Sequence, residues 1–258
     1  MTKEQFIKRL QHAVAEMASL VHDSSGNWAV KGFIDIEQMI YTISADTKVI
    51  SKILELYIFP RLVQFSQENE LEIELPRSQN TYPDITFKDK EGHLFAVDLK
   101  TSYRKDNRTI NGMTLGTFTG YFRKRDSIDH ITHPYQEYCA HLALGVIYSR
   151  TNKIDERRCY KLNELKDIKS VAHDFQFFVQ EKWRIASDVP GSGNTKNIGS
   201  VKDIDALVNG HGVFAGLGES YFDDYWMHYL TKEMAHAAEL ASPYYDDISS
   251  YKKFKHLE

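Results

Sequence analysis

The stretch that decides the fold is residues 82–103, YPDITFKDKEGHLFAVDLKTSY. Two runs rich in Ile, Phe, Val and Leu flank KEG at 90–92, a pattern that predicts two antiparallel strands joined by a tight turn. Because side chains alternate along a strand, Asp98 and Lys100 share one face. A turn at this place also brings Asp84 abreast of Asp98 on the partner strand.

Two carboxylates and an ammonium group from this hairpin form a candidate site for phosphodiester hydrolysis. Asp84 and Asp98 offer the hard oxygen ligands that Mg²⁺ prefers. A bound metal neutralises charge on a phosphate and lowers the pKa of water, and the Lys100 ammonium can stabilise developing negative charge. A strand pair with an ordinary polar face gives the same pattern, so the motif alone leaves both interpretations open.

The rest of the chain is typical of one α/β domain over residues 1–258, since it has no repeat, low-complexity segment or linker. Periodicity predicts a first helix behind a capping box at Thr2 and Gln5, and a strand pair within 27–43. A second helix begins at the cap Asp46, and Pro60 is expected to end or kink it. Further helices are expected over 134–145 and, as a long helix, over 220–240. In the helix over 220–240, core packing is favoured over base stacking for the aromatic side chains.

Composition narrows the setting of the protein. No apolar run is long enough to cross a bilayer, which predicts no membrane partner, and two cysteines fit a reducing cytoplasm. The net charge of −4 counts against a nucleic-acid partner. Basic stretches at 104–108 and 123–125 oppose that argument, because a DNA cleft can be locally basic. His130 and His133 lack a paired Cys-x-x-Cys, so a zinc site is disfavoured.

Blocks along most of the chain carry a family resemblance. They are GFIDIEQMIYTISADTKVISKILELYIFP, PRSQNTYPDIT, FAVDLKTSY, TLGTFTGYFR, HPYQEYCAHLALGVIYSR, VQEKWRIASDVPGSGNTKNIGS and FDDYW. In this order they resemble the type II restriction endonucleases of the EcoRV family, within the PD-(D/E)xK nuclease superfamily. The resemblance implies an α/β restriction-endonuclease-like fold, with a central mixed β-sheet flanked by helices and a small dimerisation subdomain.

The resemblance also implies roles for the acidic residues and the lysine. Asp84, Asp98 and Glu55 are the expected metal-binding and catalytic carboxylates, and Lys100 is the expected catalytic lysine. The expected cofactor is Mg²⁺, with Mn²⁺ as a substitute. Residues 78–100 would form the catalytic hairpin together with a minor-groove loop.

The glycine-rich stretch GSGNTKNIGS at 191–200 fits neither the P-loop nor the dinucleotide-binding spacing. Its composition alone favours a plain turn. By resemblance it is a base-recognition loop, in which an asparagine amide can pair with adenine. The expected DNA-binding residues are Gly191, Ser192, Gly193, Asn194, Thr195, Lys196, Gln79, Asn80 and Thr119.

The function implied by the resemblance is Mg²⁺-dependent hydrolysis of double-stranded DNA at a palindrome, GATATC, with a blunt central cut and 5′-phosphate ends. It implies a cytoplasmic homodimer, with dimerisation elements at 28–44 and about 146–162, and a cognate DNA methyltransferase that protects the host. The chain departs from the family pattern at Ser78, where a glutamine is expected, and in a less basic tail. A structure-specific repair or recombination nuclease with the same metal core is the alternative, and a DNA-binding protein without catalysis is disfavoured.

Overall fold

A computed structural model describes residues 1–151, 158–191 and 196–257. Its centre is a five-stranded sheet in the order β3-β4-β5-β7-β9, in which β5 and β7 run parallel and the other neighbours antiparallel. The sheet is therefore mixed, as expected. The strands are β3 (Glu72–Glu74), β4 (Ile85–Lys88), β5 (Leu94–Tyr103), β7 (Tyr138–Arg150) and β9 (Ala172–Glu181).

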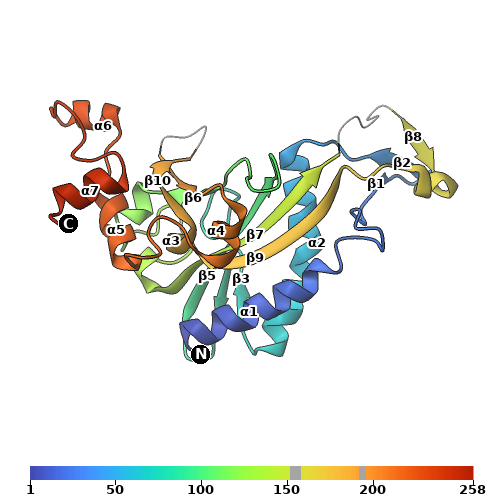
Figure 1. The fold of residues 1–258 in the computed structure, drawn as a ribbon. Coiled ribbons are helices and arrows are strands. Elements are labelled where there is room, and N and C mark those ends of the chain that lie inside the picture. The colour runs from blue at the N-terminus through green and yellow to red at the C-terminus, as the bar shows by residue number, and fades with distance from the viewer. Residues whose placement is uncertain (152–157, 192–195, 258) are drawn as a thin grey trace.

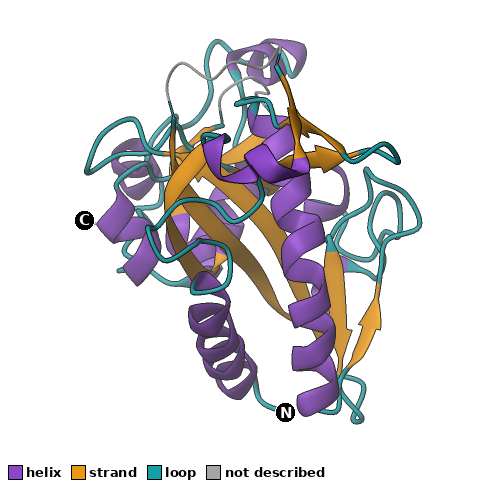
Figure 2. Cartoon of the chain, turned by 90° about the vertical axis from the view of Figure 1, so that its right-hand side faces the viewer, coloured by secondary structure: helices purple, strands orange, loops and turns teal. Residues whose placement is uncertain are grey.

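Two long helices cover one face of this sheet, α1 (Lys3–Ala18) and α2 (Thr47–Glu68) (Figures 1 and 2). The expected capping box begins α1: the Thr2 hydroxyl accepts from the Gln5 N–H, and the Gln5 side chain accepts from the Thr2 N–H. Their apolar stripes join side chains of the sheet in one buried cluster, in which the Phe6 ring stacks on Phe95. The two helices cover this face of the sheet, so a functional site is expected on the opposite face.

The second face carries short elements and a separate aromatic cluster. They are β6 (Thr114–Thr117), η1 (Gly120–Phe122), α3 (Lys182–Ile185), β10 (Ala186–Pro190), β11 (Asn197–Ser200), α4 (Ile204–Asn209), α5 (Glu219–His228), α6 (Lys232–Ala237) and α7 (Ile248–Phe254). Strands β10, β11 and β6 form a small antiparallel sheet in that order. Phe222, Tyr225 and Trp226 of α5 are buried in the cluster, as expected.

A third small sheet stands away from the central sheet at one end of the molecule (Figure 1). It consists of β1 (Gly32–Ile34), β2 (Met39–Thr42) and β8 (Cys159–Lys161), followed by the 3₁₀ helix η3 (Leu162–Asp167). The strand pair predicted within 27–43 is thereby confirmed. None of the described helices is long and apolar enough to cross a membrane.

The helix predicted over 134–145 is wrong. Only a short 3₁₀ turn, η2 (Tyr135–Glu137), precedes the strand β7, which covers the rest of that segment. The strand lies between β5 and β9, and both of its faces are buried almost throughout. A strand buried on both faces is a continuous apolar run without alternation, so periodicity cannot distinguish it from a buried helix.

Two helix ends also differ from the prediction. The helix α2 continues through Pro60 to Glu68, with buried side chains on both sides of the proline, such as Ile58 and Leu62. Proline removes the hydrogen bond to the carbonyl four residues earlier, which here belongs to Leu56. Leu56 is 62% exposed, so the lost hydrogen bond lies on the solvent side of the helix and the helix continues. The long helix over 220–240 is divided into α5 and α6, because Thr231 caps a new helix through the Met234 N–H.

Candidate active site

The open end of the β4–β5 pair brings the two expected metal ligands together. Ile85 pairs with Val97, so Asp84, just before β4, lies opposite Asp98. The Asp84 N–H donates to Asp98 Oδ1 at 3.3 Å, and the Leu99 N–H donates to Asp84 Oδ2 at 2.7 Å. The predicted juxtaposition of these carboxylates across the hairpin is confirmed.

Two ammonium groups converge on one oxygen of Asp98. Lys100 Nζ lies 2.8 Å from Asp98 Oδ2, and Lys182 Nζ lies 2.7 Å from the same atom. Lys182 comes from α3, far along the chain, and its side chain is only 6% exposed. Sequence reasoning missed it; the available signal was a lysine within the otherwise strand-like run FFVQEKWRIAS.

The two carboxylates have opposite electrostatic surroundings. Burial, reinforced by the charge of Asp98, raises the pKa of Asp84 to about 6. Burial also acts to raise the pKa of Asp98, but the charges of Lys100 and Lys182 outweigh it and hold that pKa well below its usual range. For Lys182, burial outweighs the attraction of Asp98 and lowers the pKa to about 8. Negative charge at Asp84 is thus the less compensated of the two.

This donor set fits a divalent cation. Both carboxylates offer hard oxygen ligands, and the raised pKa of Asp84 is the effect that an added positive charge would reverse. Glu55, the third expected ligand, is not brought to them: its side chain is 43% exposed on α2 and pairs with Lys52 at 2.7 Å. Among the described residues, these three carboxylates do not form a group with ligand atoms within 4.8 Å of one another.

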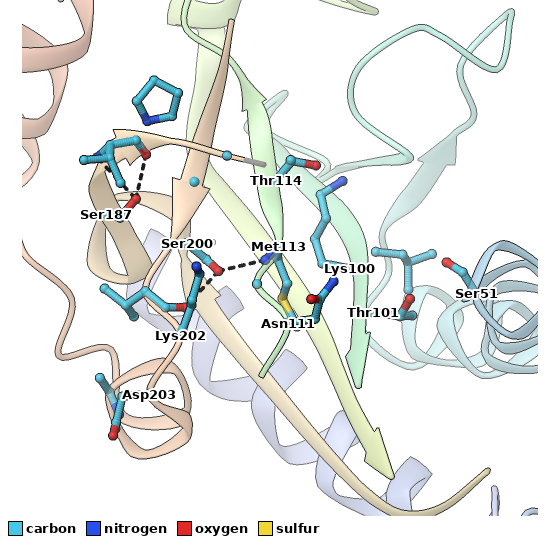
Figure 3. Close-up of a pocket in the computed structure, with 18 residues that line it drawn as sticks. Ser51, Lys100, Thr101, Asn111, Met113, Thr114, Ser187, Ser200, Lys202 and Asp203 are labelled. Atoms are coloured by element: carbon cyan, nitrogen blue, oxygen red, sulfur yellow. Dashed lines mark hydrogen bonds between the residues drawn. The ribbon is translucent and has the colours of Figure 1, made fainter. Parts of the chain in front are cut away.

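Two hollows meet at Lys100. One, with a volume of about 630 Å³, is lined by Asp98, Lys100 and three expected DNA-binding residues, Gln79, Asn80 and Thr119. The other, of about 750 Å³, extends from Lys100 and Ser51 to Gly191 (Figure 3). Segments that are distant in sequence therefore line two hollows that share this lysine.

The base of the expected recognition loop is tied to the segment that carries Thr119. The Lys196 carbonyl accepts hydrogen bonds from the Phe118 N–H at 3.0 Å and from Thr117 Oγ1 at 3.1 Å. The Gly191 N–H donates to the Asn197 carbonyl at 2.8 Å, which closes the loop at its base. Ser192, Gly193, Asn194 and Thr195 lie outside the described residues.

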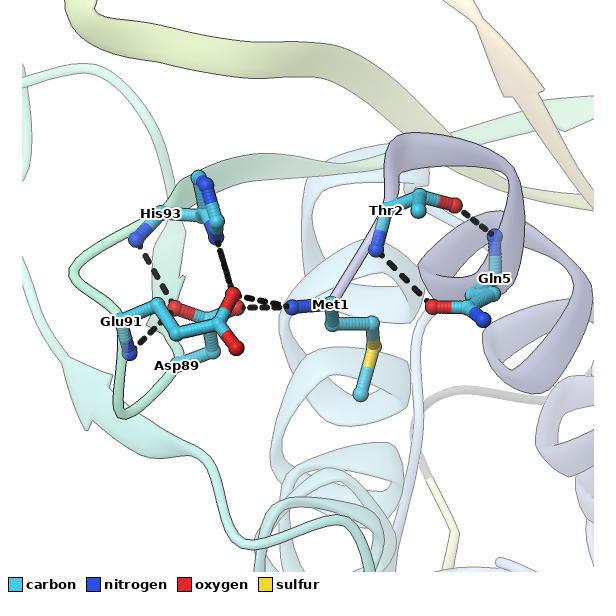
Figure 4. Close-up of polar contacts among 6 residues, drawn as sticks. All are labelled: Met1, Thr2, Gln5, Asp89, Glu91 and His93. Carbon is cyan, nitrogen blue, oxygen red and sulfur yellow. Dashed lines mark hydrogen bonds and ion pairs between the residues drawn. The ribbon is translucent and has the colours of Figure 1, made fainter.

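A second acidic group lies at the turn of the same hairpin (Figure 4). One ligand atom each from Asp89, Glu91 and His93 lies within 4.8 Å of the others, a spacing that could hold a metal ion. The Met1 amino group already occupies the centre of this group, 2.5 Å from Asp89 Oδ2 and 3.2 Å from Glu91 Oε2. The chain's own N-terminus thus supplies a cation there.

The histidines and the basic stretch at 123–125 have structural partners. His133 Nε2 lies 2.5 Å from Glu74 Oε2, and the buried His141 bonds to the Tyr82 hydroxyl at 2.8 Å. No zinc-type group of His and Cys occurs among the described residues. Arg123 donates to the Tyr229 carbonyl and Arg125 pairs with Asp223, so these two cations hold α5 in place.

A mixed sheet flanked by helices carries a pair of carboxylates, one of which lines an open hollow together with a lysine, an arrangement that fits the class of restriction-endonuclease-like nucleases. The family model "Restriction endonuclease EcoRV" matches residues 24–256. The type II restriction enzyme EcoRV of Escherichia coli is 34% identical over 248 residues, which are 93% of this chain and 96% of that enzyme. The chain belongs to the EcoRV restriction endonuclease family.

Among solved structures, the NlaIV restriction endonuclease aligns over 99% of this chain and 90% of its own. The identity is 11% and the TM-score is 0.35. The family assignment therefore rests on the family model and on EcoRV.

Proposed function

We propose that this type II restriction endonuclease hydrolyses double-stranded DNA at GATATC, with a blunt central cut, using Mg²⁺. The observation that carries the proposal is the position of Lys100. Its ammonium group contacts Asp98 and lines both hollows, one bordered by Gln79 and Asn80 and the other by Gly191. A DNA duplex lying across these hollows would present a backbone phosphate at the lysine.

In this mechanism Asp84 and Asp98 hold the metal ion, with Glu55 as an auxiliary carboxylate from α2. A bound Mg²⁺ supplies neutralisation of phosphate charge and acidification of water. The Leu99 N–H keeps the Asp84 carboxylate turned toward Asp98. The Lys100 ammonium orients the attacking water or stabilises the negative charge that develops on the phosphate, and the products are a 5′-phosphate and a 3′-hydroxyl.

Base recognition is assigned to the loop at 191–200. The Asn194 amide is the group that can pair bidentately with adenine N6 and N7, and Lys196 and Thr119 are the proposed backbone contacts. Gln79 and Asn80 are the proposed minor-groove contacts. The central TA step of GATATC is easily kinked, so the inner base pairs would be read through their deformability.

A palindromic site calls for a symmetric pair of subunits. The separate sheet β1-β2-β8 supports a dimer contact there, because it carries large apolar side chains that solvent reaches. They are Phe33 at 55%, Ile34 at 59%, Ile36 at 96%, Tyr41 at 47% and Leu162 at 51% exposure. These residues lie in or beside the proposed dimerisation elements 28–44 and 146–162. Several exposed large apolar side chains on one small sheet are typical of a protein–protein contact.

The biological partners that follow are duplex DNA, a second copy of the chain and a DNA methyltransferase that protects the host's own sites in the cytoplasm. Residues 1–258 would act as one endonuclease domain, with 78–100 as the catalytic hairpin and minor-groove loop.

Digestion of a plasmid of known sequence with Mg²⁺, followed by mapping of the ends, tests this function. We expect blunt ends with 5′-phosphates at every GATATC, and no cutting of a matched plasmid with one base pair of each site changed. Cutting at a different palindrome would overturn the proposed site alone. Random nicking, or cutting restricted to junctions and flaps, would favour a structure-specific nuclease with the same metal core.

A further inference from the structure

Lys182 is the one lysine besides Lys100 that contacts Asp98 among the described residues. Its ammonium group lies 4.1 Å from the centre of the Tyr82 ring, and both side chains of the Lys182–Asp98 pair are 6% exposed. Gly116 covers it from above: a Cβ on this glycine, whose φ is +111°, would lie 3.6 Å from Lys182 Nζ. The lysine is thus held among fixed partners with little access to bulk water.

The backbone that carries Lys182 continues directly into the expected recognition loop. The short helix α3 leads into β10, and β10 leads to Gly191. The Ile185 carbonyl accepts from the Val201 N–H at 2.9 Å, which fastens this segment to the residue after β11. A shift of β10 would therefore move the anchor of Lys182, and with it the group that holds Asp98.

Lys182 also competes with a metal ion for the same carboxylate. Its Nζ and that of Lys100 both bind Asp98 Oδ2, while Asp98 Oδ1 accepts from the Asp84 N–H. A cation at Asp98 must therefore share the carboxylate with two ammonium groups. Like charges a few ångströms apart oppose each other strongly in a buried setting.

We propose that Lys182 is a positioning residue, an internal counter-ion that holds Asp98 for the metal and links this carboxylate to the strand that carries the recognition loop. The inference rests on the proposed function for the role of Asp98 as a metal ligand. Removal of Lys182 should change the affinity for a divalent cation and the turnover in opposite directions. Without the Lys182 charge, a divalent cation binds more tightly, but Asp98 loses its fixed position and turnover falls.

The test compares Lys182→Met and Lys182→Gln with the wild-type protein. Mn²⁺ binding to the DNA-free protein is followed by the electron paramagnetic resonance of free Mn²⁺, and cleavage is measured separately at saturating metal. We expect Mn²⁺ affinity to rise by about tenfold in both variants, which lack the positive charge. Turnover should fall by about tenfold or more in Lys182→Met, which also lacks the donor that holds Asp98. Lys202→Met, a lysine that lines the larger hollow away from Asp98, is the matched control and should leave Mn²⁺ affinity unchanged.

Unchanged or weakened Mn²⁺ affinity in both variants would overturn the proposal, since a lysine that only supports the fold would weaken binding and turnover together. If Lys182→Met fails to fold, Lys182→Gln, which keeps a donor to Asp98, decides the outcome. In an Asp98→Asn background the Lys182→Gln change should no longer affect Mn²⁺ binding. Because Mn²⁺ binding is measured without DNA, failure of the proposed cleavage would be seen in the wild-type digestion and not in this assay.

Discussion

The two ends of the β4–β5 hairpin carry acidic groups with opposite electrostatics. At the turn, burial acts to raise the pKa of Asp89, but hydrogen bonds from the Met1 amino group, from His93 and from backbone N–H groups hold it well below its usual range. At the open end, burial and the neighbouring Asp98 raise the pKa of Asp84 to about 6. Hydrogen bonds therefore stabilise the negative charge of Asp89, whereas the negative charge of Asp84 is incompletely compensated.

The difference follows from the backbone. A tight turn folds its own N–H groups onto an aspartate, as Glu91 and His93 do here at 3.0 and 2.9 Å. In the extended strands most N–H groups bond to a neighbouring strand. The Leu99 N–H reaches Asp84 and the Asp84 N–H reaches Asp98, and the positive charge at the open end comes from two lysines. Three acidic or histidine ligands close together are therefore a weaker indication of a metal site than a carboxylate pair in which one charge is incompletely compensated and the other borders an open hollow.

The largest expected effect comes from making the same change at both ends. Asp84→Asn should lower the cleavage rate by on the order of 10³-fold, because loss of a metal ligand removes several kcal/mol of transition-state stabilisation. Asp89→Asn should cut at the wild-type rate. Initial rates on plasmid DNA at saturating Mg²⁺ measure both. Loss of cleavage in Asp89→Asn with normal cleavage in Asp84→Asn would move the metal site to the turn.

A second effect concerns acid. The buried His141 lies on β7 beside Ala96 of β5, close to the open end of the hairpin. Burial, and then the charge of Lys182, hold the pKa of His141 well below its usual range. In the unfolded chain His141 takes up a proton near pH 6.5, whereas in the folded chain it stays neutral at that pH. The free energy of unfolding should therefore fall below pH 6.5, by up to about 1.4 kcal/mol per pH unit from this group.

Urea denaturation of the wild type and of His141→Gln between pH 7.5 and 5.5 isolates this contribution. The variant should lose the extra slope. Equal slopes in wild type and His141→Gln would show that this histidine takes up its proton in the folded state.

The smallest effect is on stability at neutral pH. Asp89→Asn should lower the free energy of unfolding, because the Asp89 side chain is only 7% exposed and a carboxylate pKa held below its usual range stabilises the fold above that pKa. Asp84→Asn should leave the metal-free protein as stable or make it more stable, because a raised carboxylate pKa destabilises the fold above that pKa. Urea denaturation at pH 7.5 in EDTA compares them. A clear loss of stability in Asp84→Asn would contradict the view that its charge is poorly compensated.

The sequence by itself determined the features that local physics controls. Alternation along 82–103 was enough to predict the hairpin and to place Asp84 beside Asp98, since register follows from a tight turn. Side-chain caps likewise predicted the starts of α1 and α2, because Thr2 and Asp46 bond to N–H groups only a few residues away. The family resemblance supplied the prediction of a recognition loop at 191–200, where local pattern alone favours a turn, and that role stays a prediction.

Only the tertiary structure decided the identity of β7 and the place of Lys182. The apolar segment after Tyr138 is a strand because two neighbouring strands and two layers of side chains surround it, and none of these neighbours is adjacent in sequence. Lys182 reaches Asp98 because α3 packs against β7 and β9 of the central sheet, and its burial depends on Tyr82 and Gly116. Burial and charge compensation depend on long-range contacts, which no short stretch of sequence contains.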